Sequence, residues 1–154
     1  MNILVSECLI CEKHKVAAAP VYQNDMLYVS HRQAWREGDA VYLGYYFIEP
    51  KRHFRGMYDA TDEEMAALGI MMKRLAQALI SLPEIEHVYS FIMGEGVNHF
   101  HIHLVARYAG APKEYLGAKV DEWPNAPKGD KTAIAVFDEK VRSNLQRYIE
   151  NDFA

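Results

Sequence analysis

Between residues 99 and 105 the chain alternates histidine with large apolar residues, in the order His-Phe-His-Ile-His-Leu-Val. Successive side chains of a β-strand point to opposite faces, so a strand places His99, His101 and His103 on one face. The apolar residues between them then face a core. The pattern predicts a strand over residues 97–107 that is buried on one side and carries three imidazoles on the other.

Three neighbouring imidazoles can divide the work of phosphate chemistry. A neutral imidazole is a nucleophile near neutral pH, and a second one can donate to phosphoryl oxygens where negative charge develops. Three histidines can also bind one metal ion, and a purely structural role is the least expected of the three. The pattern therefore leaves a catalytic site and a metal site open.

The surrounding sequence predicts one mixed domain over residues 1–154. Residues rich in Val, Tyr, Phe and Ile predict strands at 26–31, 40–49 and 87–93. Turn residues separate these strands at short intervals. We therefore expect an α+β fold, with helices packed on an antiparallel β-sheet.

Two helices are expected, and the first is the clearer. Thr61 and Glu64 form a capping box, and apolar residues then repeat at spacings of three and four as far as Leu79. A second helix is expected over residues 138–150, with Asp138 as its cap. Residues 109–131 contain Gly and Pro throughout and predict a long loop.

Composition excludes several classes of protein. The formal net charge is −4, which argues against a general polyanion binder, so no nucleic-acid partner is expected. The first ten residues lack the basic start of a signal peptide, and the apolar runs are too short for a membrane span. We expect a cytoplasmic protein with no membrane partner.

The two cysteines form a Cys-x-x-Cys pair, Cys8 and Cys11. Two residues between them let both thiolates reach one metal ion, although the pair alone is half a site. Inert thiols are the main alternative. A redox pair is less expected, because the βαβ pattern of thioredoxin-like proteins does not follow. His14 is a nearby candidate that could replace a further ligand.

The histidine-rich stretch matches the signature of the histidine triad family at every position, and its lead-in from Gly94 to Asn98 is similar as well. Upstream, Pro50-Lys51-Arg52-His53 resembles the family's Pro-Lys-x-His segment, in the correct order. The resemblance extends from about Met26 to Arg107. The chain is therefore identified by its motifs as a member of this family.

The resemblance implies a function and a mechanism. Family members hydrolyse or transfer nucleotidyl groups, and attack the α-phosphate of nucleoside phosphoramidates or dinucleoside polyphosphates. His101 is then the nucleophile, its tautomer fixed by a backbone carbonyl, and forms a covalent nucleotidyl-histidine; His103 holds phosphate oxygens. Asn98, Gly96 and Arg107 are assigned to substrate binding. The chemistry needs no metal, and a homodimer is expected.

The resemblance also implies a structural Zn²⁺. In many members an N-terminal Cys-x-x-Cys is completed by the Pro-Lys-x-His histidine and the first triad histidine. The ligands here are then Cys8, Cys11, His53 and His99. Such a closed set would fix residues 1–20, as a zinc-binding arm, to the sheet beside His101.

Departures from the family pattern support a different function. Glu95 replaces the usual Gln, Gly96 stands where a hydroxyl is common, and Gly44-Tyr45 replaces Gly-His. The alternative is a zinc-containing nucleotide-binding or regulatory module with little turnover. A metal-dependent hydrolase is disfavoured, because the Cys-x-x-Cys pair offers softer zinc ligands than the three histidines.

Other residues have two interpretations each. The basic side chains near the motifs either bind phosphate oxygens or are solvated surface charges: Lys51, Arg52, Arg55 and Arg107. The aromatic residues from Tyr42 to Phe47 stack on a base or pack the strand. His31 and His87 are interpreted as ordinary polar positions.

Overall fold

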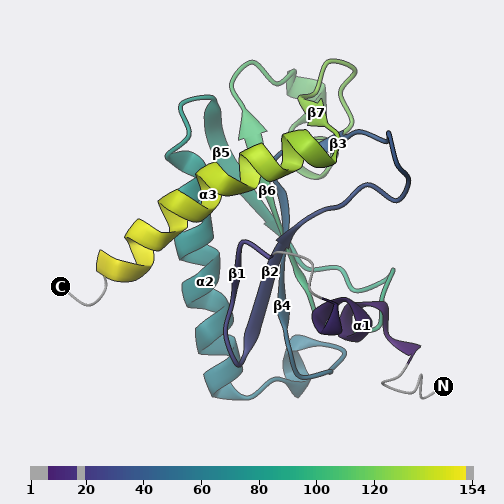
Figure 1. Cartoon of the computed structure of the whole chain (residues 1–154), viewed down its shortest axis with the longest axis vertical. Coiled ribbons are helices and arrows are strands. Elements are labelled where there is room, and N and C mark those ends of the chain that lie inside the picture. The colour runs from purple at the N-terminus through teal and green to yellow at the C-terminus, as the bar shows by residue number, and fades with distance from the viewer. Residues whose placement is uncertain (1–6, 17–19, 152–154) are drawn as a thin grey trace.

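The computed structural model describes residues 7–16 and 20–151. Its centre is an antiparallel sheet with the strand order β1-β2-β4-β6-β5 (Figure 1). This arrangement, with helices on the sheet, confirms the expected α+β fold. The strands are β1 (Tyr22–Gln23), β2 (Leu27–His31), β4 (Tyr45–Pro50), β5 (Ile85–Phe91) and β6 (Ile102–Tyr108).

Helices cover both faces of the sheet. The long helix α2 (Asp62–Ile80) packs on β4, β5 and β6, and α3 (Lys131–Asn151) packs on α2. The short helix α1 (Leu9–Lys15) lies on the other side of the sheet (Figure 1). One face of the sheet therefore supports the main core, while the other is covered by α1 and carries the candidate functional site described below.

The start of α2 confirms the predicted capping box. The hydroxyl of Thr61 accepts from the backbone N–H of Glu64, and the Glu64 carboxylate accepts from the backbone N–H of Thr61. Two of the helix's free N–H groups are satisfied in this way. Arg52 donates twice to the same carboxylate, which joins the loop after β4 to the helix.

Alternation along β4 assigns its side chains to the two faces. Tyr46 and Ile48 are fully buried, and the Tyr46 hydroxyl donates to Asp138 on α3. Phe47 and Glu49 therefore point the other way, towards α1. Phe47 pairs with His103 of β6, so the triad strand presents His103 on the α1 side.

The predicted strand over residues 97–107 is wrong in its first half. β6 begins only at Ile102, so His99 and His101 precede the ladder. There the chain bonds to the loop after β4: the Phe100 N–H donates to the Phe54 oxygen at 2.7 Å. These contacts replace strand pairing, and they turn His99 away from the surface that His103 faces.

The predicted strand 40–49 is two strands. A turn at Gly44 separates β3 (Val41–Tyr42) from β4, and its φ of +96° is in the region that favours glycine. A Cβ at this position would lie 2.9 Å from the Ala106 Cβ. The close approach of two strands therefore explains the interruption.

The predicted loop 109–131 and helix 138–150 also need correction. The loop contains β7 (Lys128–Gly129), which pairs with β3, and α3 begins at Lys131. Asp130 caps α3 by accepting from the Ala133 N–H, whereas Asp138 is buried inside the helix. The short 3₁₀ turns are η2 (Met57–Asp59), η3 (Lys113–Tyr115) and η4 (Gly117–Lys119).

Candidate metal centre and catalytic cavity

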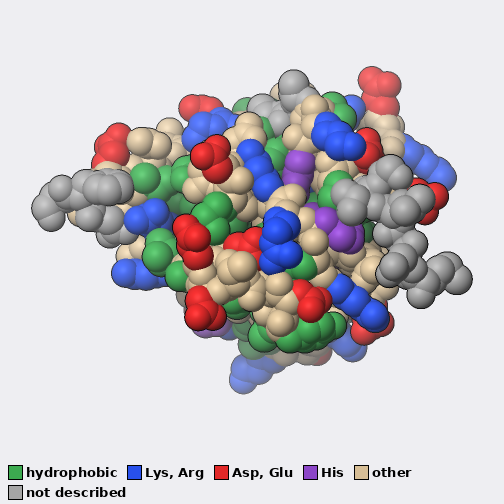
Figure 2. Space-filling view, turned by 90° about the horizontal axis from the view of Figure 1, so that it is seen from below, with side chains coloured by type: hydrophobic (Ala, Val, Ile, Leu, Met, Phe, Trp, Pro, Cys, Tyr) green, Lys and Arg blue, Asp and Glu red, His purple; other side chains and the backbone are tan. Residues whose placement is uncertain are grey.

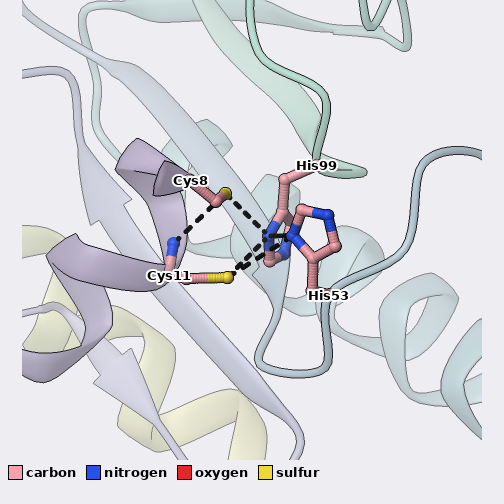
Figure 3. Close-up of side chains that lie close together, drawn as sticks. All are labelled: Cys8, Cys11, His53 and His99. Carbon is pink, nitrogen blue, oxygen red and sulfur yellow. Dashed lines mark hydrogen bonds between the residues drawn. The ribbon is translucent and has the colours of Figure 1, made fainter. Parts of the chain in front are cut away.

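Four side chains of kinds that can bind a metal meet between α1 and the sheet (Figure 3). Cys8 caps α1 and Cys11 lies in its first turn, while His53 follows β4 and His99 precedes β6. One ligand atom from each residue lies within 4.8 Å of all the others. Three separate segments of the chain thus converge on one point.

The distances in this cluster fit a tetrahedral metal ion. The Cys11 sulfur lies 3.4 Å from His53 Nδ1 and 3.5 Å from His99 Nδ1, and the two Nδ1 atoms are 3.2 Å apart. Tetrahedral zinc with ordinary bond lengths gives sulfur–nitrogen edges of about 3.6 Å and nitrogen–nitrogen edges of about 3.3 Å. These three distances therefore match edges of a zinc tetrahedron, and the Cys8 sulfur, 3.5 Å from His99 Nδ1, matches a fourth edge.

The protonation of the cluster also suits a cation. His99 Nε2 donates to the Pro50 oxygen at 2.8 Å, which leaves the lone pair of Nδ1 for a metal. Burial lowers the pKa of His99 to about 4, so the ring is neutral. Burial and the adjacent Cys8 raise the pKa of the Cys11 thiol to about 11. A bound cation opposes that rise because it stabilises the thiolate.

His14 is outside this cluster, contrary to the alternative left open above. Its Nε2 lies 2.8 Å from a carboxylate oxygen of Glu49, a buried residue of β4. Figure 2 shows one face of the molecule, on which histidine side chains reach the surface among lysines and arginines. His53 is the half-buried member of the set.

A cavity of about 490 Å³ lies beside the cluster and contains two of the triad histidines. Its walls come from α1, the segment after β2, the outward face of β4 and the start of β6. Apolar and aromatic side chains dominate it, as in most small-molecule sites. The lining residues are Leu9, Ile10, Lys13, His31, Arg32, Gln33, Ala34, Trp35, Tyr45, Phe47, Glu49, Val97, His101 and His103.

His101 is held in a defined orientation at the cavity wall. Its Nδ1 donates to the backbone oxygen of His99 at 2.7 Å, which places the proton on Nδ1. The lone pair of Nε2 is therefore free. His101 is 8% exposed, so it is shielded from bulk water while it lines the cavity.

His103 lies next to His101, with ring centroids 4.8 Å apart. Its Nδ1 is 2.8 Å from the hydroxyl of Tyr45, which lies on β4. Burial lowers the pKa of His103 to about 4, and the charges of His101 and Arg32 act in the same direction. His103 is thus a neutral hydrogen-bonding group beside the candidate nucleophile.

A buried carboxylate forms another part of the wall. Glu49 is 1% exposed and receives hydrogen bonds from Lys13 at 2.5 Å and from His14 at 2.8 Å. Burial raises the pKa of Glu49, but these two partners outweigh it, so the net pKa lies below its usual range. Both partners belong to α1, so the pairs tie that helix to β4.

The residues assigned to substrate binding lie away from the main cavity. Gly96 and Asn98 line a smaller hollow of about 140 Å³, beside Cys8 and His53. Val97 lies between them and lines both spaces. The two residues are therefore adjacent to the metal cluster rather than opposite His101.

Three of the four expected basic residues, Arg107, Lys51 and Arg52, have partners elsewhere, and Arg55 does not line the cavity either. Arg107 donates to the Tyr89 hydroxyl at 3.0 Å and lies 3.4 Å from Glu86 on β5. Lys51 donates to Gln23, and Arg52 is paired with Glu64 as described above. None of these three side chains lines the cavity in the described part of the chain.

Sequence reasoning missed two cations in the cavity, Lys13 and Arg32. Arg32 directly follows β2, and a charged side chain at a strand end was the available signal. His31 was also misjudged as an ordinary polar position: it is 1% exposed, and burial lowers its pKa to about 4. His87 is exposed on β5, as expected.

Comparison with known proteins agrees with this geometry. Residues 16–110 match the family model described as HIT domain, which covers more than half of the chain. The chain belongs to the HIT family. Family membership supports the general class of nucleotide hydrolase or transferase, and so an enzyme of this superfamily. A search of curated proteins finds no match.

Solved structures share the fold of this HIT protein. A zinc-bound histidine triad family protein from Mycobacterium smegmatis has a TM-score of 0.68 at 16% identity, over 95% of this chain and 98% of that chain. A hypothetical histidine triad nucleotide-binding protein from Sulfolobus tokodaii also has a TM-score of 0.68 at 16% identity, over 91% of this chain and 93% of that chain. A uridylyltransferase has a TM-score of 0.64 at 20% identity, over 92% of this chain and 46% of the uridylyltransferase chain.

The helices give no indication of a membrane span. No helix among the described residues is both long enough and apolar enough to cross a bilayer.

Proposed function

We propose that this HIT protein hydrolyses or transfers a nucleotidyl group by attack of His101 on an α-phosphate. The observation that carries the proposal is the 2.7 Å hydrogen bond from His101 Nδ1 to the His99 oxygen. It fixes the tautomer in which Nε2 is a nucleophile. The cavity beside it has room for a nucleotide phosphate, and the ring itself is almost fully buried.

The first step forms a covalent intermediate. The lone pair of His101 Nε2 attacks the α-phosphorus, the bond to the leaving group breaks, and the leaving group departs with that electron pair. The imidazole becomes cationic, and the His99 oxygen stabilises it through the Nδ1 proton. Water then attacks the same phosphorus, the phosphorus–nitrogen bond breaks, and the proton released by water passes to solvent.

His103 and Tyr45 support the phosphoryl group in this proposal. The Tyr45 hydroxyl lies 2.8 Å from His103 Nδ1, and we assign the hydroxyl as the donor, which puts the proton of the neutral ring on Nε2. That N–H is then a donor for a phosphoryl oxygen as charge develops there. Asn98 and Gly96 are proposed to contact a part of the substrate that extends past Val97.

The metal site has a structural role in this account. We assign Zn²⁺ to Cys8, Cys11, His53 and His99, because the set is closed and its edges fit zinc. The ion would fix α1 against the sheet and so complete one wall of the cavity. No step of the phosphate chemistry requires it.

We also propose that the enzyme is a cytoplasmic homodimer, following the resemblance. β5 is the last strand of the sheet, so one of its edges has no partner among the described strands. Sedimentation equilibrium tests this, and a monomer at micromolar concentration contradicts it.

Turnover of the His101→Ala variant tests the function. We expect its kcat on an adenosine phosphoramidate or a diadenosine polyphosphate to fall by about 10⁴-fold or more, as for other lost nucleophiles. His87→Ala is the matched control, because His87 is an exposed histidine on β5. Equal rates for His101→Ala and the wild type contradict the proposal. No turnover by the wild type supports the nucleotide-binding module instead.

A further inference from the structure

Among the described residues that line the cavity, two side chains carry a permanent positive charge, Lys13 and Arg32. Lys13 is committed to the protein, because its ammonium lies 2.5 Å from the buried Glu49 carboxylate and 3.5 Å from the Ser30 hydroxyl. Moving it to a ligand would leave a buried carboxylate without its cation, which is costly. Lys13 is therefore part of the wall.

Arg32 is held by its backbone, and its guanidinium stacks on the Tyr45 ring but is only loosely paired with an acid. Its backbone N–H donates to the backbone oxygen of Tyr45 at 2.8 Å, and its guanidinium lies 5.1 Å from the centre of the Tyr45 ring. Its ion pair with Asp121 is long, at 3.4 Å, and the side chain is 43% exposed. A guanidinium has five donors, so most of them remain available to a ligand.

The same contacts connect Arg32 to the reacting group. The Tyr45 ring on which Arg32 stacks also carries the hydroxyl that contacts His103 at 2.8 Å, and His103 lies beside His101. Arg32, Tyr45, His103 and His101 form a continuous wall of one cavity. A group that leaves a phosphorus atom in front of His101 is therefore released into the same cavity that Arg32 lines.

We propose that Arg32 binds the leaving group of the reaction, and that this group is an anionic phosphate oxygen. When the phosphorus–oxygen bond breaks, the oxygen keeps the electron pair and its negative charge. A guanidinium neutralises that charge with two parallel hydrogen bonds and transfers no proton.

An amine leaving group needs a proton, which arginine cannot supply. The inference rests on the proposed function. It narrows the substrate to nucleotides whose α-phosphate is linked to further phosphate.

Titration with inorganic tripolyphosphate tests the binding half without any turnover. We expect Arg32→Gln to bind it about tenfold or more weakly than the wild type by calorimetry, as for one lost charge-assisted contact. Arg36→Gln is the matched control, because Arg36 is an exposed cation of the same segment outside the cavity. Equal affinities of Arg32→Gln and Arg36→Gln overturn the assignment.

Kinetics with two substrates tests the reaction half. Arg32→Gln should lose about tenfold more kcat/KM on a diadenosine polyphosphate than on an adenosine phosphoramidate, which share the α-phosphate and differ in leaving group. Equal losses on both overturn the leaving-group role. If the wild type turns over neither substrate, the proposed function fails, and the tripolyphosphate titration still decides whether Arg32 binds phosphate.

Discussion

The backbone oxygen of His99 lies 2.7 Å from His101 Nδ1, while the imidazole of the same His99 belongs to the Cys/His cluster. One residue thus contributes its ring to the candidate metal centre and its carbonyl to the candidate nucleophile. Its ring is fixed a second time by the Pro50 oxygen. The position of His101 therefore depends on the cluster being intact.

Loss of the metal should lower stability and activity together. We expect one zinc ion per chain in the purified protein, and a Cys11→Ser variant that lacks it. Its melting temperature should fall by on the order of 10 °C, because binding energy at a structural site is folding energy. Metal analysis and thermal unfolding measure the two effects.

The control for this variant is Glu12→Gln, an exposed change on the same helix. It should keep both the metal and the melting temperature. A catalytic metal predicts a different result: chelation would abolish turnover while the folded state persists at the assay temperature.

The Tyr45 hydroxyl should matter for the rate more than for the fold. Tyr45→Phe keeps the ring under Arg32 and removes the hydrogen bond to His103. We expect kcat to fall about tenfold, the effect of one lost hydrogen bond, with little change in melting temperature. Tyr108→Phe also removes a buried hydroxyl contact, to the Leu43 oxygen, and should leave kcat unchanged. Equal kcat values for the two variants refute the role of Tyr45.

His31 should make stability depend on pH. Burial lowers its pKa from 6.5 to about 4, so the unfolded state binds more protons between these values. Its contribution is complete above pH 6.5 and is lost as the pH falls towards 4, by on the order of 3 kcal/mol. Urea unfolding of the wild type and of His31→Gln across this range measures it. The variant should be less stable than the wild type at pH 7, and its free energy of unfolding should change less with pH. If the free energies of unfolding of the two proteins change in parallel with pH, the assignment is wrong.

Trp35 should report binding through its fluorescence. It lines the cavity and is 85% exposed, whereas Trp123 packs against the main core. A base that stacks on Trp35 should quench its emission, and Trp35→Phe should lose the change while Trp123 still emits. An undiminished change in Trp35→Phe would place the base elsewhere.

The sequence predicts the fold class, the start of α2 and the closeness of Cys8 and Cys11, because these depend on local patterns. Alternation at residues 99–105, the capping box at Thr61 and the Cys8–Cys11 spacing each depend on neighbours in the chain. The partners His53 and His99 came from the order of family motifs, and the structure places all four side chains together. The expectation that His53 and His99 lie beside the two cysteines thus followed from the family resemblance and not from residue spacing.

The charges of the cavity were not predictable in the same way. Lys13 lies on α1 and Arg32 follows β2. Only the packing of α1 on β4 puts the two side chains in the wall of one cavity. Arg107 was expected there because it follows the triad, but its strand position directs it to Glu86 and Tyr89. Strand register and helix docking decide such contacts, and local sequence patterns do not reveal them.

The most direct test of the account is intact-mass spectrometry after rapid quench with a diadenosine polyphosphate or an adenosine phosphoramidate. The wild type should carry one added adenylyl group, mapped to His101, and His101→Ala should carry none. An adduct on another residue, or turnover by the wild type with no adduct at any quench time, would contradict covalent catalysis at His101.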